Sequence, residues 1–358
     1  FDQSESFSNG NTSFTTRANQ VVRRFDGATG ALQPAQTVMI PHIQLNGSFS
    51  TSAVAPSLIG LNDNSVLIGF HSTTAPDALM PDFDASTFGV YARGLSDTNV
   101  TGAFTRVNQT TTGDQRNVSF LVSPGGALVS LFVSTASGTP AVMMNVNGAE
   151  SVVDNQFVMS QDTRPRAAFL DADSLVVVYE RQYSAYVPGV SDSNNVAFTI
   201  MNVNGTGESA RIDVTTPDQV GVSVDNPQIA VGRDGTFLVA WDERGTGASA
   251  GTIRGRIYTA AGVAVGAAFD ISPISQSGGV GGAAATPGFS LDAMPDGRFF
   301  VSWGTYDGHV KGAFVDGRTQ GVVFVGTDLG DEAVGTGFDD DMSGGLDDYT
   351  LYGGLGHD

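Results

Sequence analysis

The sequence predicts an all-β chain, and three observations carry that prediction. Glycine is abundant, at 46 of 358 residues, whereas only 15% of the residues are charged. Short stretches rich in valine, threonine and aromatic residues alternate between apolar and polar positions, which is the period of a strand rather than of a helix. Turn-forming pairs such as Asp234-Gly235 separate these stretches. The chain therefore consists of short strands joined by tight turns.

The N-terminal segment reads as part of a larger repeat unit. Val21–Ala31 has the pattern of a strand followed by a glycine turn, which matches the second half of the unit described next. Phe1–Gln3 resembles Trp241–Glu243, the end of a first half. We therefore expect the chain to begin inside a unit, so that the first copy is incomplete.

A hairpin unit follows this partial copy and occurs five times. Its second strand ends in an aromatic residue, and these residues, spaced by 62, 47, 62 and 62 positions, are Phe70, Phe132, Tyr179, Trp241 and Trp303. A second half-unit with a glycine or asparagine turn follows each hairpin, as in Ile253–Gly266. Each unit therefore supplies about four antiparallel strands.

Repeated four-stranded units without helices predict a β-propeller of about six four-stranded blades, with seven blades as the alternative. Each sheet of a propeller buries both faces against its neighbours, and a closed ring leaves no open end. A row of two-sheet sandwiches is the rival architecture, but a unit of about 60 residues is short for a sandwich of roughly 100. We assign 1–325 to the propeller, with its first blade incomplete.

The charge of the chain excludes several kinds of partner. A formal net charge of −20 repels phosphate backbones, which argues against nucleic-acid binding. No apolar run approaches the roughly 18 residues that a membrane span requires, so membrane insertion is not expected. The chain has no cysteine, which excludes disulfides and cysteine-based zinc sites. An acidic surface does suit divalent cations.

From Gly326 onward the repeat length changes to nine residues. Glycine begins each segment, at positions 326, 335, 344 and 353, and an apolar residue takes the eighth position of the three complete segments. Aspartate takes the sixth position in three of the four segments, and 326–358 holds nine acids without a lysine or arginine. Such a segment either folds around cations or remains an acidic linker.

This pattern resembles the RTX nonapeptide repeat of type I secreted bacterial proteins, G-G-x-G-x-D-x-U-x with U apolar. Gly353–Asp358 matches the start of that repeat in full, whereas the first two segments lack two of its glycines. The resemblance implies a short parallel β-roll that binds calcium between stacked turns. The sequence stops inside this array, so we expect the array to be truncated here and the native chain to continue. It also implies an extracellular or cell-surface location reached by type I secretion. The implied metal-binding residues are Asp331, Asp340, Gly344, Asp347, Asp348, Gly353 and Asp358.

Candidates for catalysis are few. Neither H-E-x-x-H nor G-x-S-x-G occurs, which argues against a metalloprotease and an α/β-hydrolase. Acidic residues do follow the aromatic residue at two equivalent strand ends, where one rim of the ring would gather them with Asp242 and Arg244. An acid pair beside an arginine suits an anionic polysaccharide. The candidate catalytic residues are Glu180, Arg181 and Glu243, with Tyr186 as a further acid or base.

Two other sets of residues have a structural and a functional interpretation. The hairpin-turn aspartates, among them Asp171, Asp234 and Asp296, either form the turns or bind surface calcium. Trp241 and Trp303 either pack in the core or stack on sugars, and their regular spacing favours packing.

Three functions remain open at this point. The missing catalytic signatures and the calcium tail favour a non-enzymatic extracellular module for adhesion or a surface matrix, with calcium, glycans or other surface proteins as partners. A secreted propeller enzyme that cleaves anionic polysaccharides, as a lyase or a glycosidase, is the competing hypothesis. A lectin-like propeller that binds glycans without cleaving them is the third.

Overall fold

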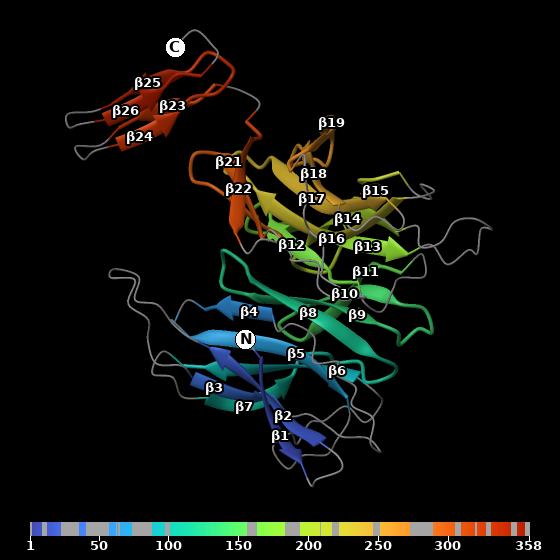
Figure 1. Cartoon of the computed structure of the whole chain (residues 1–358). Coiled ribbons are helices and arrows are strands. Elements are labelled where there is room, and N and C mark those ends of the chain that lie inside the picture. The colour runs from blue at the N-terminus through green and yellow to red at the C-terminus, as the bar shows by residue number, and fades with distance from the viewer. Residues whose placement is uncertain are drawn as a thin grey trace. The chain divides into compact units, whose positions relative to one another are not determined.

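The chain is described by a computed structural model (Figure 1). Every regular element in the residues that it describes is a strand. The described residues are 2–8, 13–22, 36–40, 57–61, 63, 65–73, 88–96, 101–155, 163–182, 194–207, 209–216, 222–245, 251–272, 289–304, 309–318, 321–326, 331–344 and 349–354.

The first of two compact units comprises Phe1–Pro165 and Met201–Glu208. Its described residues form one three-stranded and two four-stranded sheets, and consecutive strands pair in antiparallel fashion in each. The strands are β1 (Asp2–Ser8), β2 (Ser13–Val22) and β3 (Gln36–Ile40); β4 (Ser57–Gly60), β5 (Val66–Thr73), β6 (Phe88–Leu95) and β7 (Thr101–Arg106); and β8 (Gln115–Val122), β9 (Leu128–Ser134), β10 (Ala141–Val146) and β11 (Ala149–Asp154).

The second unit comprises Arg166–Ile200 and Ser209–Asp358. It repeats the same meander in two four-stranded sheets and a sheet with three described strands. The strands are β12 (Arg166–Phe169), β13 (Ser174–Gln182), β14 (Asn194–Asn202) and β15 (Ile212–Asp213); β16 (Val222–Val231), β17 (Phe237–Gly245), β18 (Gly251–Tyr258) and β19 (Ala264–Asp270); and β20 (Phe289–Ala293), β21 (Arg298–Gly304) and β22 (Val310–Asp316). The predicted all-β propeller fold with four-stranded antiparallel blades is confirmed.

Aspartate side chains close the hairpin turns. The Asp171 carboxylate accepts hydrogen bonds from the Ser174 N–H at 2.8 Å and the Ser174 hydroxyl at 2.9 Å. Asp234 accepts from the Thr236 N–H at 3.0 Å and its hydroxyl at 2.6 Å, and Asp296 accepts from the backbone two residues on. These contacts are those of aspartate turns. The turn-forming interpretation is therefore the one that the geometry supports.

The periodic aromatic residues lie in the core. Trp241 is 1% exposed and belongs to an apolar cluster that β13, β14, β16, β17 and β18 share. In that cluster the Phe237 ring stacks on Tyr258 at 5.3 Å between centroids, and Phe198 meets both rings edge-on. Trp303 is buried in the next cluster with Phe299. Both tryptophans therefore serve in packing.

The C-terminal tail changes from antiparallel to parallel pairing. β23 (Val323–Val325) pairs with β25 (Asp341–Ser343), and β24 (Asp331–Val334) pairs with β26 (Tyr349–Tyr352). The partners are 18 residues apart, as in Val323↔Asp341, which is the length of two nine-residue segments. The tail sheets begin at Val323, so β23 lies before the predicted boundary at 326. Calcium binding and a complete β-roll stay predictions.

Candidate functional site

Two carboxylates face each other where β16 begins and β17 ends. Asp225 is the direct partner of Asp242 in the antiparallel register. Directly opposed residues lie on one face of a sheet with their Cβ atoms about 5 Å apart. The Arg244 guanidinium binds Asp225, with Nη2 at 2.7 Å from Oδ2. The end of this sheet thus carries an acid pair with an arginine on one of its members.

The two acids differ in environment. Asp242 is 1% exposed, whereas the Asp225 side chain is 27% exposed. Burial raises the pKa of Asp242 to about 7; Arg244 and the Asn226 side chain oppose that rise, and the neighbouring Asp225 carboxylate adds to it. Asp242 therefore keeps its proton up to neutral pH, while the ion pair with Arg244 uses the ionised form of Asp225. Unequal carboxyl groups of this kind are typical of acid–base sites.

A β-bulge sets the position of Asp225. The register of β16 against β17 shifts between Asp225 and Gln228, so that Asn226 lies in the bulge. Asn226 has a φ of 54°, in the left-handed region that asparagine tolerates better than most residues. Bulges change the direction of neighbouring side chains and are frequent next to active sites. Without this bulge Asp225 would not lie level with Asp242.

Glu180 reaches the same bulge from the neighbouring sheet. Its Oε1 accepts a hydrogen bond from the Asn226 N–H at 2.5 Å. Glu180 from β13 and Asp242 from β17 therefore come together around Asn226. The sequence predicts these two strand ends at one rim, but the structure gives the Glu180 carboxylate a backbone partner.

The other predicted catalytic residues lie in separate contacts. Glu243 accepts a hydrogen bond from the Trp241 Nε1–H at 3.2 Å and pairs with Arg254 at 3.0 Å. Because successive residues of a strand point to opposite faces, Glu243 points away from Asp242. Arg181 is 0% exposed and lies 3.4 Å from Asp213. Each of these ion pairs therefore joins strands of a single sheet, and Tyr186 lies outside the described residues.

Sequence reasoning missed Asp225 as a site residue. The sequence feature that could have pointed to Asp225 is the Asn226-Pro227 pair directly after it, which interrupts an otherwise regular strand pattern. Such a pair marks a break in the backbone, here a bulge.

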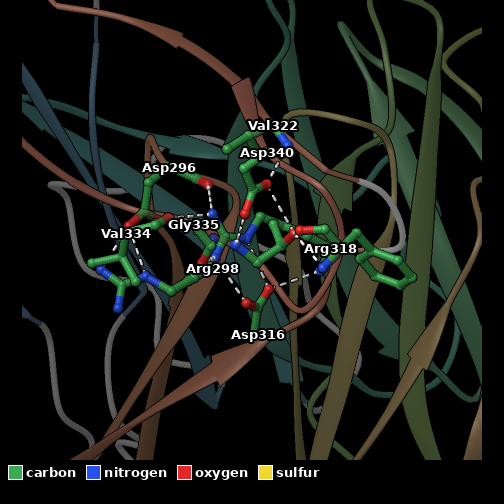
Figure 2. A network of polar contacts seen from close by, with 10 residues as sticks. Asp296, Arg298, Asp316, Arg318, Val322, Val334, Gly335 and Asp340 are labelled. Carbon is green, nitrogen blue, oxygen red and sulfur yellow. Dashed lines mark hydrogen bonds and ion pairs between the residues drawn. The ribbon is translucent and has the colours of Figure 1, made fainter. Parts of the chain in front are cut away.

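The predicted metal ligand Asp340 lies in a network that joins the tail to the last described sheet of the second unit (Figure 2). Asp340 is 7% exposed; its Oδ1 accepts from the Val322 N–H at 2.7 Å, and its Oδ2 accepts from the Thr336 N–H at 2.6 Å. The Thr336 hydroxyl donates a third bond. Burial alone would raise the pKa of Asp340, but these bonds lower it below its usual value. Asp340 therefore binds the backbone of two tail turns.

Arg318 is the other centre of this network (Figure 2). Its guanidinium donates to the Val334 carbonyl at 2.8 Å and to the Gly335 carbonyl at 2.6 Å, and it pairs with Asp316 at 2.8 Å. The stacking of the turns is close, because a Cβ atom at Gly335 would collide with the Gly353 carbonyl. Arg318 thus fastens the first tail turns to the end of β22.

The remaining predicted metal ligands are incompletely described. Among the described residues no group of three or more histidines and acids is placed to hold a metal ion. Asp331 lies in β24, Gly344 lies against the Tyr349 ring, and Gly353 lies against Gly335. The other predicted ligands, Asp347, Asp348 and Asp358, lie outside the described residues.

No protein-family model matches the chain, and no curated protein matches it. Several solved structures are similar to it in fold. An α-L-arabinofuranosidase from Fusarium graminearum with an iminosugar inhibitor shares 11% identity, over 75% of this chain and 81% of that chain, with a TM-score of 0.48. An α-L-arabinanase from Penicillium chrysogenum with arabinobiose shares 12%, over 75% and 94%, with a TM-score of 0.47. A protein of unknown function from Dyadobacter fermentans shares 12%, over 74% and 79%, with a TM-score of 0.48.

The expectation of a non-enzymatic adhesion or surface-matrix module is wrong by this comparison. Where these structures carry a named activity, they are arabinofuranosidases, arabinanases and a family-43 glycoside hydrolase. Identities of 9 to 14% with TM-scores below 0.5 assign no reaction to this chain, so its chemistry must be argued from its own residues.

In the part of the chain described, no helix is long and apolar enough to cross a membrane.

Proposed function

We propose that the chain is a glycan-cleaving enzyme whose reacting groups are Asp225 and Asp242. The observation that carries the proposal is their direct opposition at the end of β16 and β17, with one acid buried and the other bound to Arg244. Most glycoside hydrolases act through two carboxyl groups, one protonated and one ionised, on either side of the bond that breaks.

The roles follow from the two environments. Asp242, whose pKa is about 7, is the general acid and gives its proton to the glycosidic oxygen as the carbon–oxygen bond breaks. Asp225, the ionised partner held by Arg244, attacks the sugar carbon as that bond breaks and forms a glycosyl ester. Water then attacks the same carbon, the ester bond to Asp225 breaks, and the proton of the water passes to Asp242. Directly opposed positions have Cβ atoms about 5 Å apart, which favours the shorter of the two carboxyl separations known for glycoside hydrolases, the one that goes with retention of configuration.

The charges of the site favour a neutral glycan over the anionic one expected from the sequence. Arg244 already binds Asp225, Arg254 binds Glu243 and Asp270, and Arg181 lies buried beside Asp213. The arginines near the acids therefore have carboxylates of the protein as partners, and a uronate would meet the chain's net charge of −20.

The test is a panel of neutral and anionic polysaccharides incubated with the purified chain, with release of reducing ends as the readout. We expect cleavage of a neutral polysaccharide, at least a hundredfold loss in Asp242→Asn and in Asp225→Asn, and full activity in the control Asp292→Asn, an exposed acid on β20. Binding without release by the wild-type chain would instead establish the lectin-like function. Equal release by the wild type and Asp242→Asn would contradict the acid pair.

We also propose that the tail binds calcium and that the chain works outside the cell after type I secretion. The support is the parallel pairing of β23 with β25 and of β24 with β26 at an 18-residue offset, together with the resemblance of 326–358 to RTX repeats. Asp340 fits a backbone partner better than a metal ligand, because its two oxygens accept three hydrogen bonds. The ligands in this proposal are therefore Asp331, Asp347, Asp348 and Asp358, with the carbonyl groups of Gly344 and Gly353.

Calorimetric titration of the whole chain with calcium tests this proposal. Wild type should bind calcium, and a variant with Asp347→Asn and Asp348→Asn should bind it at least tenfold more weakly. Asp292→Asn, which removes one exposed carboxyl group on β20, serves as the control for a general effect of lost charge. Absence of calcium binding by the wild type, or unchanged binding by the double variant, would contradict the proposal.

A further inference from the structure

Glu180 has a contact that the proposed reaction does not use. Its carboxylate accepts the N–H of Asn226, the residue in the left-handed conformation directly after Asp225. A backbone amide bound to a carboxylate makes a stronger hydrogen bond than one bound to a neutral acceptor. A left-handed asparagine in a bulge is a strained conformation that persists only where its surroundings hold it. Glu180 supplies that hold from a different sheet.

The first unit contains the same construction at an equivalent position of the repeat. The register of β8 against β9 shifts between Arg116 and Ser119, and Asn117 in that shift has a φ of 59°. The Asn117 N–H donates to Nδ1 of His71 at 3.2 Å. His71 follows Phe70 as Glu180 follows Tyr179. The bulge and its acceptor from the preceding sheet are thus properties of the repeat, whereas the acceptor's charge is particular to each copy.

The two copies differ at the acid pair. In the first unit the position of Asp225 is taken by Arg116 and that of Asp242 by Val133, which are directly opposed in the register. Arg116 pairs with Asp114 at 2.7 Å and lies over the Phe88 ring. That copy therefore has the bulge but no pair of carboxyl groups, and it offers a control for effects of the bulge on folding alone.

We propose that Glu180 is a positioning residue of the proposed glycan-cleaving site, because it holds the Asn226 bulge and with it the alignment of Asp225 against Asp242. This inference rests on the proposed function. Glu180 acts through the backbone and touches neither the substrate nor the reacting atoms. A displacement of about 1 Å in a reacting group can reduce a rate about a hundredfold, so a modest relaxation of the bulge is sufficient for a large effect.

The kinetic test compares Glu180→Ala with Glu180→Gln, because glutamine keeps an acceptor oxygen where alanine has none. Glu180→Ala should lower kcat by ten- to a hundredfold with KM changed less than threefold, and Glu180→Gln should recover at least tenfold of that loss. The matched control is His71→Ala, which removes the equivalent acceptor in the first unit and should leave kcat within twofold of the wild type. Wild-type kcat in Glu180→Ala would overturn the inference, as would an equal loss in His71→Ala.

A second readout separates this inference from the proposed function. The titration of Asp242, followed by carboxyl carbon NMR, depends on its burial and on the nearby Asp225 and Arg244. Glu180→Ala should move its midpoint by at least half a pH unit, while Glu180→Gln and His71→Ala should leave it in place. If the wild type cleaves no glycan, the proposed function fails, and this titration still decides the role of Glu180. An unmoved midpoint in Glu180→Ala would overturn that role.

Discussion

The buried acid Asp242 makes a prediction about stability that needs no substrate. Its pKa is about 7 in the folded chain and near 3.8 in the unfolded chain. Between pH 4 and pH 7 the folded chain keeps the Asp242 proton, whereas the unfolded chain releases it. The protonated Asp242 therefore makes its full contribution to the free energy of unfolding below pH 4, and this contribution is lost as the pH rises to 7. Each pH unit corresponds to 1.36 kcal/mol. The loss between pH 5 and pH 8 is therefore about 3 kcal/mol.

Asp242→Asn removes this titration while keeping the shape of the side chain. We expect the free energy of unfolding of the wild type to fall by about 3 kcal/mol more than that of the variant between pH 5 and pH 8. Both tryptophans, Trp241 and Trp303, lie in the second unit, so urea titrations followed by tryptophan fluorescence report on the unit that contains Asp242.

The control for this experiment is Asp292→Asn, which removes an exposed carboxyl group on β20 and should keep the wild-type pH dependence. The comparison with both variants cancels the titration of the other acids. If the wild type and Asp242→Asn lose the same stability from pH 5 to pH 8, the folded-state pKa of Asp242 is not raised, and the assignment of Asp242 as a proton donor near neutral pH is refuted.

Three further predictions concern the core and the tail. Phe237→Ala removes a fully buried ring and should cost about 3–5 kcal/mol, measured as a lower urea midpoint; a cost under 1 kcal/mol would contradict the packing described. Arg318→Ala removes the bonds to the Val334 and Gly335 carbonyls, and should speed amide exchange in β24 at least tenfold, whereas unchanged protection would show that the tail is held otherwise. Asp340→Ala should destabilise the tail by about 1–3 kcal/mol in calcium and in chelator alike, and a cost seen only with calcium would make Asp340 a metal ligand.

The repeat made most of the fold predictable from the sequence. Pairs such as Asp234-Gly235 mark the hairpins, and the aspartate side chain does close the turn. The spacing that contains Trp241 and Trp303 predicts equivalent positions in successive sheets, where both side chains are buried. The start of the tail was harder to predict from the sequence. The apolar residues of Val323–Val325 indicate a strand, but they do not reveal whether that strand pairs in antiparallel fashion within a blade or in parallel fashion within the tail.

The candidate site was predictable only in part. The strand ends that carry Glu180 and Asp242 follow from the repeat, and the structure does place them around one residue. The pairing of Asp225 with Asp242 depends on a bulge that shifts the register after Asp225. The alternation of apolar and polar residues along a strand does not reveal the extra residue of a bulge. The register of the two strands, and with it the pair of acids that face each other, therefore could not be predicted from the sequence. The alternation along β17 could have excluded Glu243 as a partner of Asp242, because successive residues point to opposite faces.

The pH dependence of kcat/KM on a neutral polysaccharide decides whether Asp225 and Asp242 form the acid pair of a glycan-cleaving enzyme. We expect a bell-shaped profile whose alkaline limb falls with an apparent pKa of about 7, set by Asp242, and at least a hundredfold lower kcat/KM in Asp242→Asn at pH 6. A profile that stays flat from pH 6 to pH 9, or an Asp242→Asn variant as active as the wild type at pH 6, would contradict that assignment.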